Sequence, residues 1–359
     1  MPLTDFAKKT AQFYAPRFEV EIEGKTLKLE KIITQISVTE KVDEGASFSF
    51  TVFDEYDLRK EEFKWLESDL FQVENKVTIS MGYESDLETM IEGKITSVEP
   101  NFFSGEVPTI TISGHDLSFD YLKRSSPAEP FRNKTYSEIA EKIAGKANLQ
   151  PVIDRSDIRV KEIKKQNNES YYQFLKRLAE EIEFVFFVYK KKMYFVREYE
   201  YDTEEVTLAL GSDLISFKPT LNTSRFLKSV EVRGHNPKDP SKPIVAKAEA
   251  KGLISGEYIK IGSLNKKIER PPEKVVDNVI VTSVSHARKI AESILNRANQ
   301  SLLTGEGSSI GMPQIRAGIT LNLKRLGSIF SGKYYVKETG HTISNSGYTT
   351  TFSVIRRDL

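Results

Sequence analysis

Cysteine is missing from this sequence of 359 residues, and histidine occurs only four times. The lack of cysteine excludes disulfides, thiolate nucleophiles, iron–sulfur clusters and thiolate zinc sites. No two histidines have helical ligand spacing, so a histidine-rich metal site is not expected; they are His115, His235, His286 and His341. The sequence therefore predicts neither a metal site nor a cofactor site.

An excess of either charge is missing as well, because 52 lysine and arginine residues stand against 51 aspartate and glutamate residues. A dedicated nucleic-acid-binding protein would carry a strong basic excess, so stable nucleic-acid binding is not expected. The longest apolar run, Phe184–Tyr189, is far shorter than the ~20 residues that span a membrane. Residues 1–9 lack the apolar core of a signal peptide. We therefore expect a protein that is made in a cytoplasm and does not insert into membranes.

Alternation of apolar and polar residues with a period of two dominates residues 1–124 and predicts β-strands. It is clear in Phe18–Ile22, Phe48–Val52 and Val77–Met81. Six or more short antiparallel strands with tight turns predict a sandwich or a barrel. One short helix is expected among them, around Asp57–Ser68.

Residues 125–205 follow a different pattern, which predicts a small α+β module. A capping box at Thr135–Glu138 begins one amphipathic helix, and a second begins near Ser170. The aromatic segment Phe184–Tyr189 and the return strand Met193–Val196 predict a hairpin. The apolar stripe of the second helix is expected to pack on this hairpin and to form a core of Phe174, Leu178, Ile182, Phe186 and Phe195.

Strand patterns return in residues 206–245 and 302–359, which together predict a second β body. The insert at 246–301 contains a helix with a clear apolar stripe and Ser285 as its cap, expected to pack near the α+β module. The predicted fold is therefore mainly β with α+β, in which two antiparallel β bodies flank the module. We also predict that the two bodies share one barrel-like topology.

Three segments offer the residue types of an enzyme site, and each has a plainer interpretation. Gly305–Gly311 resembles a phosphate loop but follows a helix and precedes strands, so it is interpreted as a connection. The carboxylates of Glu180–Glu183 could serve acid–base chemistry, but their spacing fits a solvated helix face. His115 and His341 lack the serine of a nucleophile elbow. The sequence predicts no catalytic site and hence no enzyme.

Two other features leave alternatives open. Lys190–Lys192 is interpreted as a solvated hairpin tip, with a contact to DNA or a membrane as the alternative. The 15 tyrosines and 21 phenylalanines are assigned mainly to the core, with a carbohydrate-binding platform as the alternative.

Four segments carry motifs in a distinctive order: Thr135–Leu149, Asn168–Glu181, Ser285–Asn299 and Ala317–Phe352. The second ends in Phe-Leu-Lys-Arg-Leu-Ala-Glu-Glu and leads into the aromatic hairpin. The fourth contains Tyr-Tyr-Val, then His-Thr-Ile, then Gly-Tyr-Thr-Thr-Thr-Phe. In this order and spacing the motifs resemble the late control gene D family, the baseplate hub proteins of contractile-tailed phages. They are also similar to the first part of the VgrG spike proteins of type VI secretion.

The resemblance implies a structural hub with two tube-like antiparallel β-barrels in each chain. Three chains would form a homotrimer with pseudo-sixfold barrels, which adapts the hexameric tail tube to a trimeric spike and nucleates tube assembly. The implied partners are the tail-tube ring, other baseplate proteins and, because the chain stops at Leu359 where VgrG proteins continue, a separate spike protein. The resemblance also implies assembly in the bacterial cytoplasm and a place in a virion or injection particle. DNA or an effector would pass through the axial channel.

The C-terminal hairpin is the candidate for a channel-lining or subunit-interface element. Its strands, Tyr334–Ile343 and Tyr348–Ile355, each alternate between a polar and a more apolar side. The candidate residues are Tyr335, Lys337, His341, Tyr348 and Thr350. An ordinary surface hairpin is the plainer alternative. For the whole protein, the alternative functions are a carbohydrate- or cell-wall-binding tail module and, more distantly, a wall hydrolase.

Overall fold

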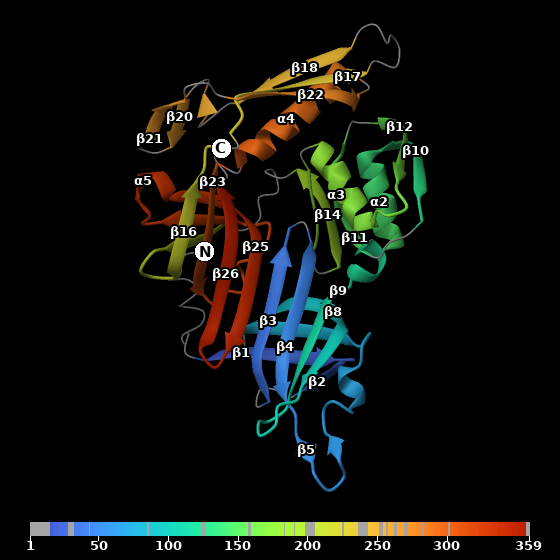
Figure 1. The fold of residues 1–359 in the computed structure, drawn as a ribbon, viewed down its shortest axis with the longest axis vertical. Coiled ribbons are helices and arrows are strands. Elements are labelled where there is room, and N and C mark those ends of the chain that lie inside the picture. The colour runs from blue at the N-terminus through green and yellow to red at the C-terminus, as the bar shows by residue number, and fades with distance from the viewer. Residues whose placement is uncertain are drawn as a thin grey trace.

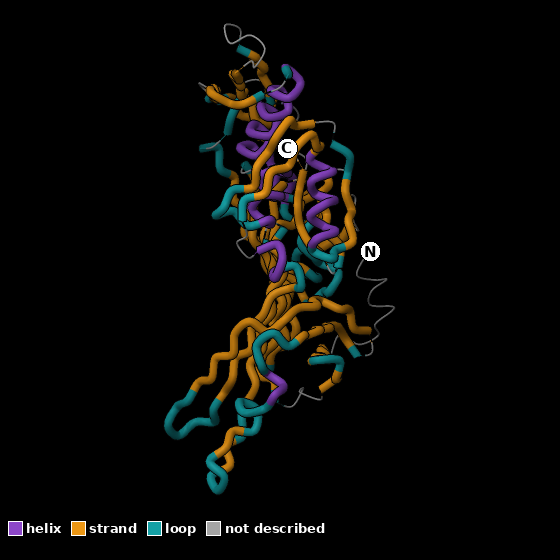
Figure 2. Tube along the Cα trace, turned by 90° about the vertical axis from the view of Figure 1, so that its right-hand side faces the viewer, coloured by secondary structure: helices purple, strands orange, loops and turns teal. Residues whose placement is uncertain are grey.

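The computed structural model describes residues 15–356, apart from 28–31, 43, 85, 124–126, 157–158, 183, 190, 198–204, 225, 236–242, 251–253, 256–257, 262–263, 269–271, 282 and 301. Thirteen strands form one large sheet along the long axis of the molecule, and the longer helices gather near one end (Figure 1). Seen from the side, two loops project from the other end (Figure 2). The predicted fold class, mainly β with a smaller α+β part, is confirmed. The predicted boundaries near 124 and 205 fall at stretches outside the described residues.

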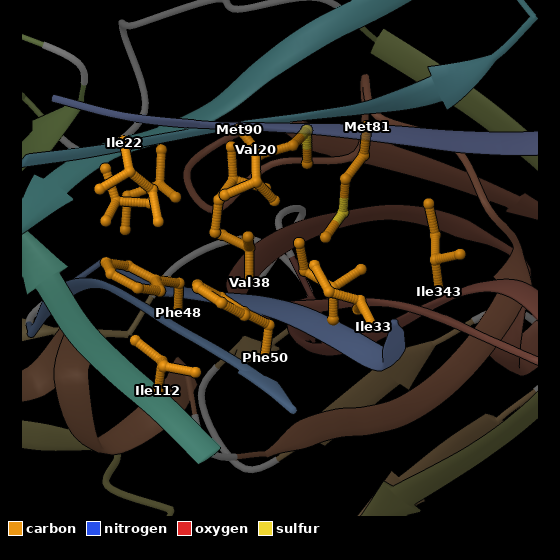
Figure 3. Close-up of a cluster of buried hydrophobic side chains, with 14 of the residues drawn as sticks. Val20, Ile22, Ile33, Val38, Phe48, Phe50, Met81, Met90, Ile112 and Ile343 are labelled. Atoms are coloured by element: carbon orange, nitrogen blue, oxygen red, sulfur yellow. The ribbon is translucent and has the colours of Figure 1, made fainter. Parts of the chain in front are cut away.

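The first β body contributes seven strands to the large sheet: β1 (Pro16–Ile22), β2 (Lys25–Leu27), β3 (Ile33–Lys41), β4 (Gly45–Phe53), β7 (Lys76–Tyr83), β8 (Asp86–Asn101) and β9 (Thr109–Asp116). Alternate residues point to opposite sides of each strand. In β4, Phe48 and Phe50 are buried, whereas Ser47 and Ser49 are only half-buried. Figure 3 shows the inward side chains meeting in one core, which includes Ile343 from the C-terminal hairpin. A strand of the second body thus completes the core of the first.

The segment Asp57–Ser68 is not a helix, which corrects the expectation from the sequence. It contains a hairpin of β5 (Tyr56–Asp57) and β6 (Glu62–Phe63), and the 3-10 helix η1 (Asp69–Phe71) follows. The reason is Asp54, a buried carboxylate that accepts hydrogen bonds from the backbone amides of Glu55, Trp65 and Leu66 at 2.8, 2.9 and 3.1 Å. These bonds hold the two ends of the segment together as a loop. The same amides are then not available to donate to carbonyls within a helix.

The α+β module follows the π-helix η2 (Phe119–Lys123). Both of its helices begin at a capping box, formed by Thr135 with Glu138 and by Ser170 with Gln173. The predicted starts of the two helices are confirmed. The elements are β10 (Glu129–Thr135), α2 (Tyr136–Lys146), β11 (Gln150–Ile153), β12 (Arg159–Lys165), α3 (Tyr171–Glu181), β13 (Phe184–Tyr189) and β14 (Lys192–Arg197).

The five residues proposed as the core of this module are all buried: Phe174, Leu178, Ile182, Phe186 and Phe195. Aromatic rings hold α3 to the strands. Phe174 stacks on Phe131 of β10 with ring centroids 5.4 Å apart, and Tyr172 meets Phe186 edge-on at 4.7 Å. The helix stripe and the hairpin therefore share one apolar cluster.

Truncation of Leu178 to alanine is expected to lower the free energy of unfolding by about 2–5 kcal/mol, because this fully buried side chain leaves a cavity. Urea unfolding of the purified protein measures the change. Leu58→Ala is the matched control, since Leu58 is 83% exposed and its truncation should cost less than about 0.5 kcal/mol. Equal losses in the two variants would contradict the assignment of α3 to the core.

The second β body contributes six strands: β15 (Glu205–Ala209), β16 (Leu214–Leu221), β23 (Leu303–Ile310), β24 (Thr320–Lys324), β25 (Gly332–Ser344) and β26 (Gly347–Arg356), with the short helix α5 (Gly327–Phe330). The segment Gly305–Gly311 is strand β23 and its end, not the connection expected from the sequence. Aromatic rings lie against its glycines: a Cβ on Gly305 would lie 2.4 Å from Phe217, and one on Gly307 would lie 2.7 Å from Phe352. Because these glycines have no side chain, the aromatic rings can pack directly against the backbone of β23.

The insert is larger than the sequence suggested, because β17 (Ser229–His235) does not join the second body. It pairs with β18 (Ile244–Glu249) and β22 (Glu273–Ile280), so the boundary placed at residue 245 does not follow the sheets. Helix α4 (Val284–Gln300) packs on this small sheet through Ala287, Ala291 and Leu295. Its N-terminal amide at His286 donates to Ser283, not to Ser285, at 3.1 Å. A further sheet consists of β19 (Ile254–Ser255), β20 (Tyr258–Ile261) and β21 (Leu264–Lys267).

The two β bodies have the same strand order. In the sheet the first body reads β3-β4-β9-β8-β7-β1, and the second reads β16-β23-β26-β25-β24-β15. The strands therefore correspond in pairs, in sheet order and in chain order: β3 to β16, β4 to β23, β9 to β26, β8 to β25, β7 to β24 and β1 to β15. One pair differs, since β1 and β7 are antiparallel whereas β15 and β24 are parallel.

Irregularities in the strands recur at the same places. The pairing of β8 with β9 shifts between Ile95 and Ser97, and that of β25 with β26 shifts between Val336 and Glu338. Likewise the pairing of β3 with β4 shifts after Ile33, and that of β16 with β23 shifts after Leu214. These bulges align the bodies residue by residue, with Ser97 in the place of Glu338 and Ser216 in the place of Gln35.

Strands β25 and β3 pair antiparallel and join the two bodies into one sheet, from Glu338 opposite Lys41 to Ser344 opposite Gln35. We call this pairing the body junction. Beside it, Arg316 donates from Nε to the carboxylate of Glu40 in β3 at 2.8 Å and from Nη2 to the carbonyl of Met90 in β8 at 2.6 Å. Both side chains of the Arg316–Glu40 pair are only 8% exposed. Buried polar contacts therefore hold the two bodies in a fixed relation.

Candidate functional site

The side of the large sheet that faces away from the body cores carries mainly hydroxyl side chains. Eight neighbouring strands form it, in the order β16-β23-β26-β25-β3-β4-β9-β8. None of these hydroxyl residues is buried, and we call them the hydroxyl face: Ser37, Thr39, Ser47, Ser49, Thr51, Ser97, Thr111, Ser113, Ser216, Ser308, Thr342, Thr349, Thr351 and Ser353.

Cross-strand registers place these residues in continuous rows. One row crosses all eight strands through Ser216, Ser308, Thr351, Gly340, Thr39, Ser47, His115 and Lys94. A second row crosses six strands through Thr349, Thr342, Ser37, Ser49, Ser113 and Ser97. Direct partners lie on the same side of a sheet. The hydroxyl face is therefore unbroken across the body junction.

The hydroxyl groups bond to one another across the strands. The Oγ atoms of Ser113 and Ser49 lie 3.2 Å apart, and those of Ser216 and Ser308 lie 2.7 Å apart. Thr51 pairs with Thr111 of β9 in the same way at 3.1 Å. The surface thus offers weak dipoles whose hydrogen bonds are already partly satisfied.

Charges on this face are few and balanced. The amine of Lys41 lies 3.5 Å from the carboxylate of Glu338, and Lys218 stands opposite Glu306 in the pairing of β16 with β23. Burial, and then the nearby Lys123, lower the pKa of His115 below 6.5, so its ring is uncharged at neutral pH. A depression of about 520 Å³ lies between β16 and β3 over these strands. The face can therefore form a polar, nearly neutral wall.

The C-terminal hairpin does not present its predicted candidates to solvent. Tyr335, His341, Tyr348 and Thr350 are buried, and only Lys337 is half-exposed, with its amine 5.4 Å from the ring of Tyr335. For His341 the cause is the bulge after Val336, which shifts the alternation of β25 by one residue. Tyr335 precedes the bulge and is buried in a cluster with Val42 and Val185. The outward residues of the hairpin are instead those of the hydroxyl face. Both sides of the hairpin are also paired within the chain, to β3 and β23, so it cannot be the subunit edge.

His341 belongs to a buried hydrogen-bond network. Its Nε2 donates to the carbonyl of Ile315 at 2.8 Å, and its Nδ1 lies 3.0 Å from the hydroxyl of Tyr348 and 3.1 Å from that of Thr350. Because Nε2 carries the proton, Nδ1 accepts, and the hydroxyl of Thr350, which itself accepts from the amide of Met312, can donate to it. Burial, and then the charge of Arg316, lower the pKa of His341 to about 3. The ring is neutral and structural.

The remaining candidates from the sequence hold elements together. Glu180 pairs with Arg297 of α4 at 3.2 Å, and Glu181 accepts a hydrogen bond from Tyr136 at 2.5 Å. Lys191, in the lysine run, pairs with Glu92 of β8 at 2.9 Å. Among the described residues, no group of three or more His, Asp or Glu side chains is placed to hold a metal ion. None of the described helices is both long and apolar enough to cross a membrane.

Sequence reasoning missed most of the hydroxyl face, including Ser37, Thr111, Ser216 and Ser308. The signal was present in the alternation of serine and threonine with apolar residues in β4 and β9. What the sequence did not indicate is that these strands lie next to one another across the two bodies.

A family model described as the Alg8 N-terminal domain matches residues 14–345. No curated protein matches the sequence.

Solved structures with the same fold come from phage tails and from type VI secretion. The 43 kDa tail protein of prophage MuSo2 from Shewanella oneidensis is 16% identical, with a TM-score of 0.74 over 96% of this chain and 99% of that one. A tail protein from Neisseria meningitidis is 12% identical, with a TM-score of 0.70 over 96% and 97%. A component of the type VI secretion system of E. coli, described as similar to T4 bacteriophage tail proteins, is 12% identical, with a TM-score of 0.61 over 94% and 76%. The chain therefore has the fold of these tail proteins.

Proposed function

We propose that this chain, which belongs to the Alg8 N-terminal domain family, is a structural baseplate hub of a contractile tail or injection system. Three copies form a homotrimeric ring in which six β bodies have pseudo-sixfold symmetry. The ring adapts a hexameric tail tube to a separate trimeric spike, and its upper surface nucleates tube assembly. It acts by shape and templating and catalyses no reaction.

The observation that carries this proposal is the repetition of one β body within the chain. Two bodies with the same strand order, joined edge to edge, give each chain two equivalent positions in a ring. Such a chain meets a sixfold partner with its bodies and a threefold partner with its other elements. The fold shared with phage tail proteins supports the same reading.

The hydroxyl face supplies the channel wall of the proposed ring. It is continuous across both bodies, is nearly neutral and lacks exposed aromatic clusters along its rows. A moving polymer, whether DNA or a polypeptide, would find few strong binding groups on such a surface. We therefore assign the hydroxyl face to the lumen.

The test is the oligomeric state of the purified full-length protein. Light scattering at micromolar concentration is expected to give three times the chain mass of 40.8 kDa. End-on electron micrographs are expected to show a ring with six lobes and an open centre. A protein that stays monomeric at these concentrations, or that forms a closed twofold dimer, would contradict the hub.

A further inference from the structure

More than half of the large apolar side chains that are exposed in the described part of the chain lie in two segments of the first body, residues 53–75 and 102–108. We call these two segments the tip. The tip projects from the end of the molecule opposite the helices (Figure 1, Figure 2). Single apolar residues are common on protein surfaces, whereas a gathered set indicates a contact surface. Its members and their exposed fractions include Tyr56 at 41%, Leu58 at 83%, Phe102 at 56%, Phe103 at 61% and Val107 at 61%.

The two segments of the tip are held to each other. The ring of Phe63 lies 4.6 Å from that of Tyr56 and 5.2 Å from that of Phe102, so the segments share one row of rings. The amide of Asp54 also donates to the carbonyl of Pro108 at 2.8 Å. The exposed apolar side chains therefore belong to an ordered surface.

The second body is complete without a tip. The counterpart of the first segment is the connection between β23 and β24, residues 311–319, most of which are buried. The counterpart of the second segment is the two-residue turn Asn345–Ser346. A β body thus needs neither long segment to close its sheet. The apolar surface of the tip is therefore not explained by the folding of the body that carries it.

Carboxylates surround this apolar surface. Residues 55–74 contain seven acidic side chains, all exposed, and only three basic ones. The amine of Lys64 pairs with Glu55 at 3.0 Å. A hollow of about 570 Å³ lies among these residues, and it is lined by Tyr56, Phe63 and four of the acidic residues. The seven acidic residues are Glu55, Asp57, Glu61, Glu62, Glu67, Asp69 and Glu74.

We propose that the tip binds a basic, apolar segment of another protein, with one segment for each chain. An arginine of that segment enters the hollow, because a guanidinium can stack on an aromatic ring and bond to a carboxylate at the same time. The apolar side chains of the segment cover Leu58 and Phe103, which gives the interface an apolar centre and a charged rim. The same carboxylates would repel an anionic membrane surface, so the charge favours a protein over a lipid.

The proposed ring sets the number of these sites. Only the first body of each chain carries a tip, so three of the six bodies in the ring would bind a segment. This number rests on the proposed function, whereas the binding of one segment by one chain does not.

Titration of the full-length protein with three fluorescent peptides of equal length tests the proposal. The first peptide alternates leucine and arginine, the second leucine and glutamate, and the third serine and arginine. We expect the leucine–arginine peptide to bind at least about tenfold more tightly than either of the others, because only it offers both apolar groups and positive charge. One peptide should bind to each chain.

Two double variants locate the peptide on the molecule. Leu58→Ser/Phe103→Ser should weaken binding of the leucine–arginine peptide by at least about tenfold, because it removes the apolar centre of the interface. Val245→Ser/Val275→Ser is the matched control and should bind like the wild type. It removes side chains that are 43% and 49% exposed on β18 and β22, away from the tip. Circular dichroism checks that both variants are folded.

A charge reversal tests the role of the carboxylates. Glu62→Lys should weaken binding of the same peptide by at least about tenfold, since Glu62 lines the hollow. Glu141→Lys is the control, because Glu141 is an exposed carboxylate on α2 at the other end of the molecule.

The outcomes separate this inference from the hub. Equal binding of the three peptides, or tight binding that Leu58→Ser/Phe103→Ser retains, overturns the tip site and leaves the hub standing. A wild-type protein that stays monomeric and binds the peptide as expected contradicts the hub and supports the tip site. If Leu58→Ser/Phe103→Ser fails to form trimers at concentrations where the control forms them, the tip is a contact between copies and the proposal is overturned.

Discussion

Replacement of Arg316 by methionine is expected to lower the free energy of unfolding by about 3–5 kcal/mol, because it leaves the carboxylate of Glu40 buried without its partner. Arg316 lies between β23 and β24 of the second body, whereas Glu40 and Met90 lie in the first. The variant therefore loses the ion pair and the bond to the Met90 carbonyl at the point where the bodies meet. Urea unfolding, followed by far-UV circular dichroism, measures the change.

The neighbouring surface pair provides the control for this variant. Lys41 follows Glu40 on β3, and its amine lies 3.5 Å from Glu338, with both side chains about 40% exposed. Lys41→Met should cost only about 0–1 kcal/mol, since solvent screens an exposed pair. The double variant Arg316→Met/Glu40→Met should regain much of the lost stability, because it removes the stranded charge. A single Arg316 variant as stable as Lys41→Met would show that the pair does not hold the bodies together.

Acidification from pH 7 to pH 5 is expected to cost about 2 kcal/mol through His341 alone. Burial, and then Arg316, depress the pKa of this ring from 6.5 to about 3, so the unfolded chain binds a proton that the folded protein excludes. Above pH 6.5 the ring is neutral in both states, so His341 does not lower the free energy of unfolding there. As the pH falls from 6.5 toward 3, the free energy of unfolding decreases by about 1.4 kcal/mol for each pH unit. No carboxylate faces the ring directly in its hydrogen-bond network.

Denaturant unfolding at pH 7 and pH 5 measures this difference. His341→Gln should be less stable than the wild type at pH 7 and should lose about 2 kcal/mol less on acidification. His235→Gln is the control, because His235 is exposed at the end of β17. An unchanged pH dependence in His341→Gln would mean that the ring has the same pKa in the folded and the unfolded protein.

Local signals in the sequence predicted much of the fold. The capping boxes at Thr135 and Ser170 begin helices in the structure because each satisfies backbone amides within four residues of chain. The helix expected near Asp57 was wrong because Asp54 bonds to amides at both ends of the segment, a contact that no periodicity reveals. Local pattern thus succeeds where the partner groups are near in sequence.

The candidate site was predicted less well, because it depends on which strands become neighbours. The alternation of the C-terminal hairpin predicted a polar side, but a single bulge after Val336 moved His341 to the interior. The hydroxyl rows continue from one body to the other only because β3 pairs with β25, nearly 300 residues away. Neither the bulge nor this long-range pairing can be predicted from a short window of sequence.

Covalent linkage of the two β bodies changes how the proposed ring responds to concentration. A ring of three chains contains six body-to-body contacts, and three of them form when each chain folds. Only the other three depend on collisions between molecules. The equilibrium concentration of the ring therefore rises with the third power of the free chain concentration, whereas a ring of six separate bodies would rise with the sixth power. Linked partners also meet at an effective concentration far above that of free subunits. In the proposed hub, the ring would therefore be complete at protein concentrations at which six separate bodies would stay apart.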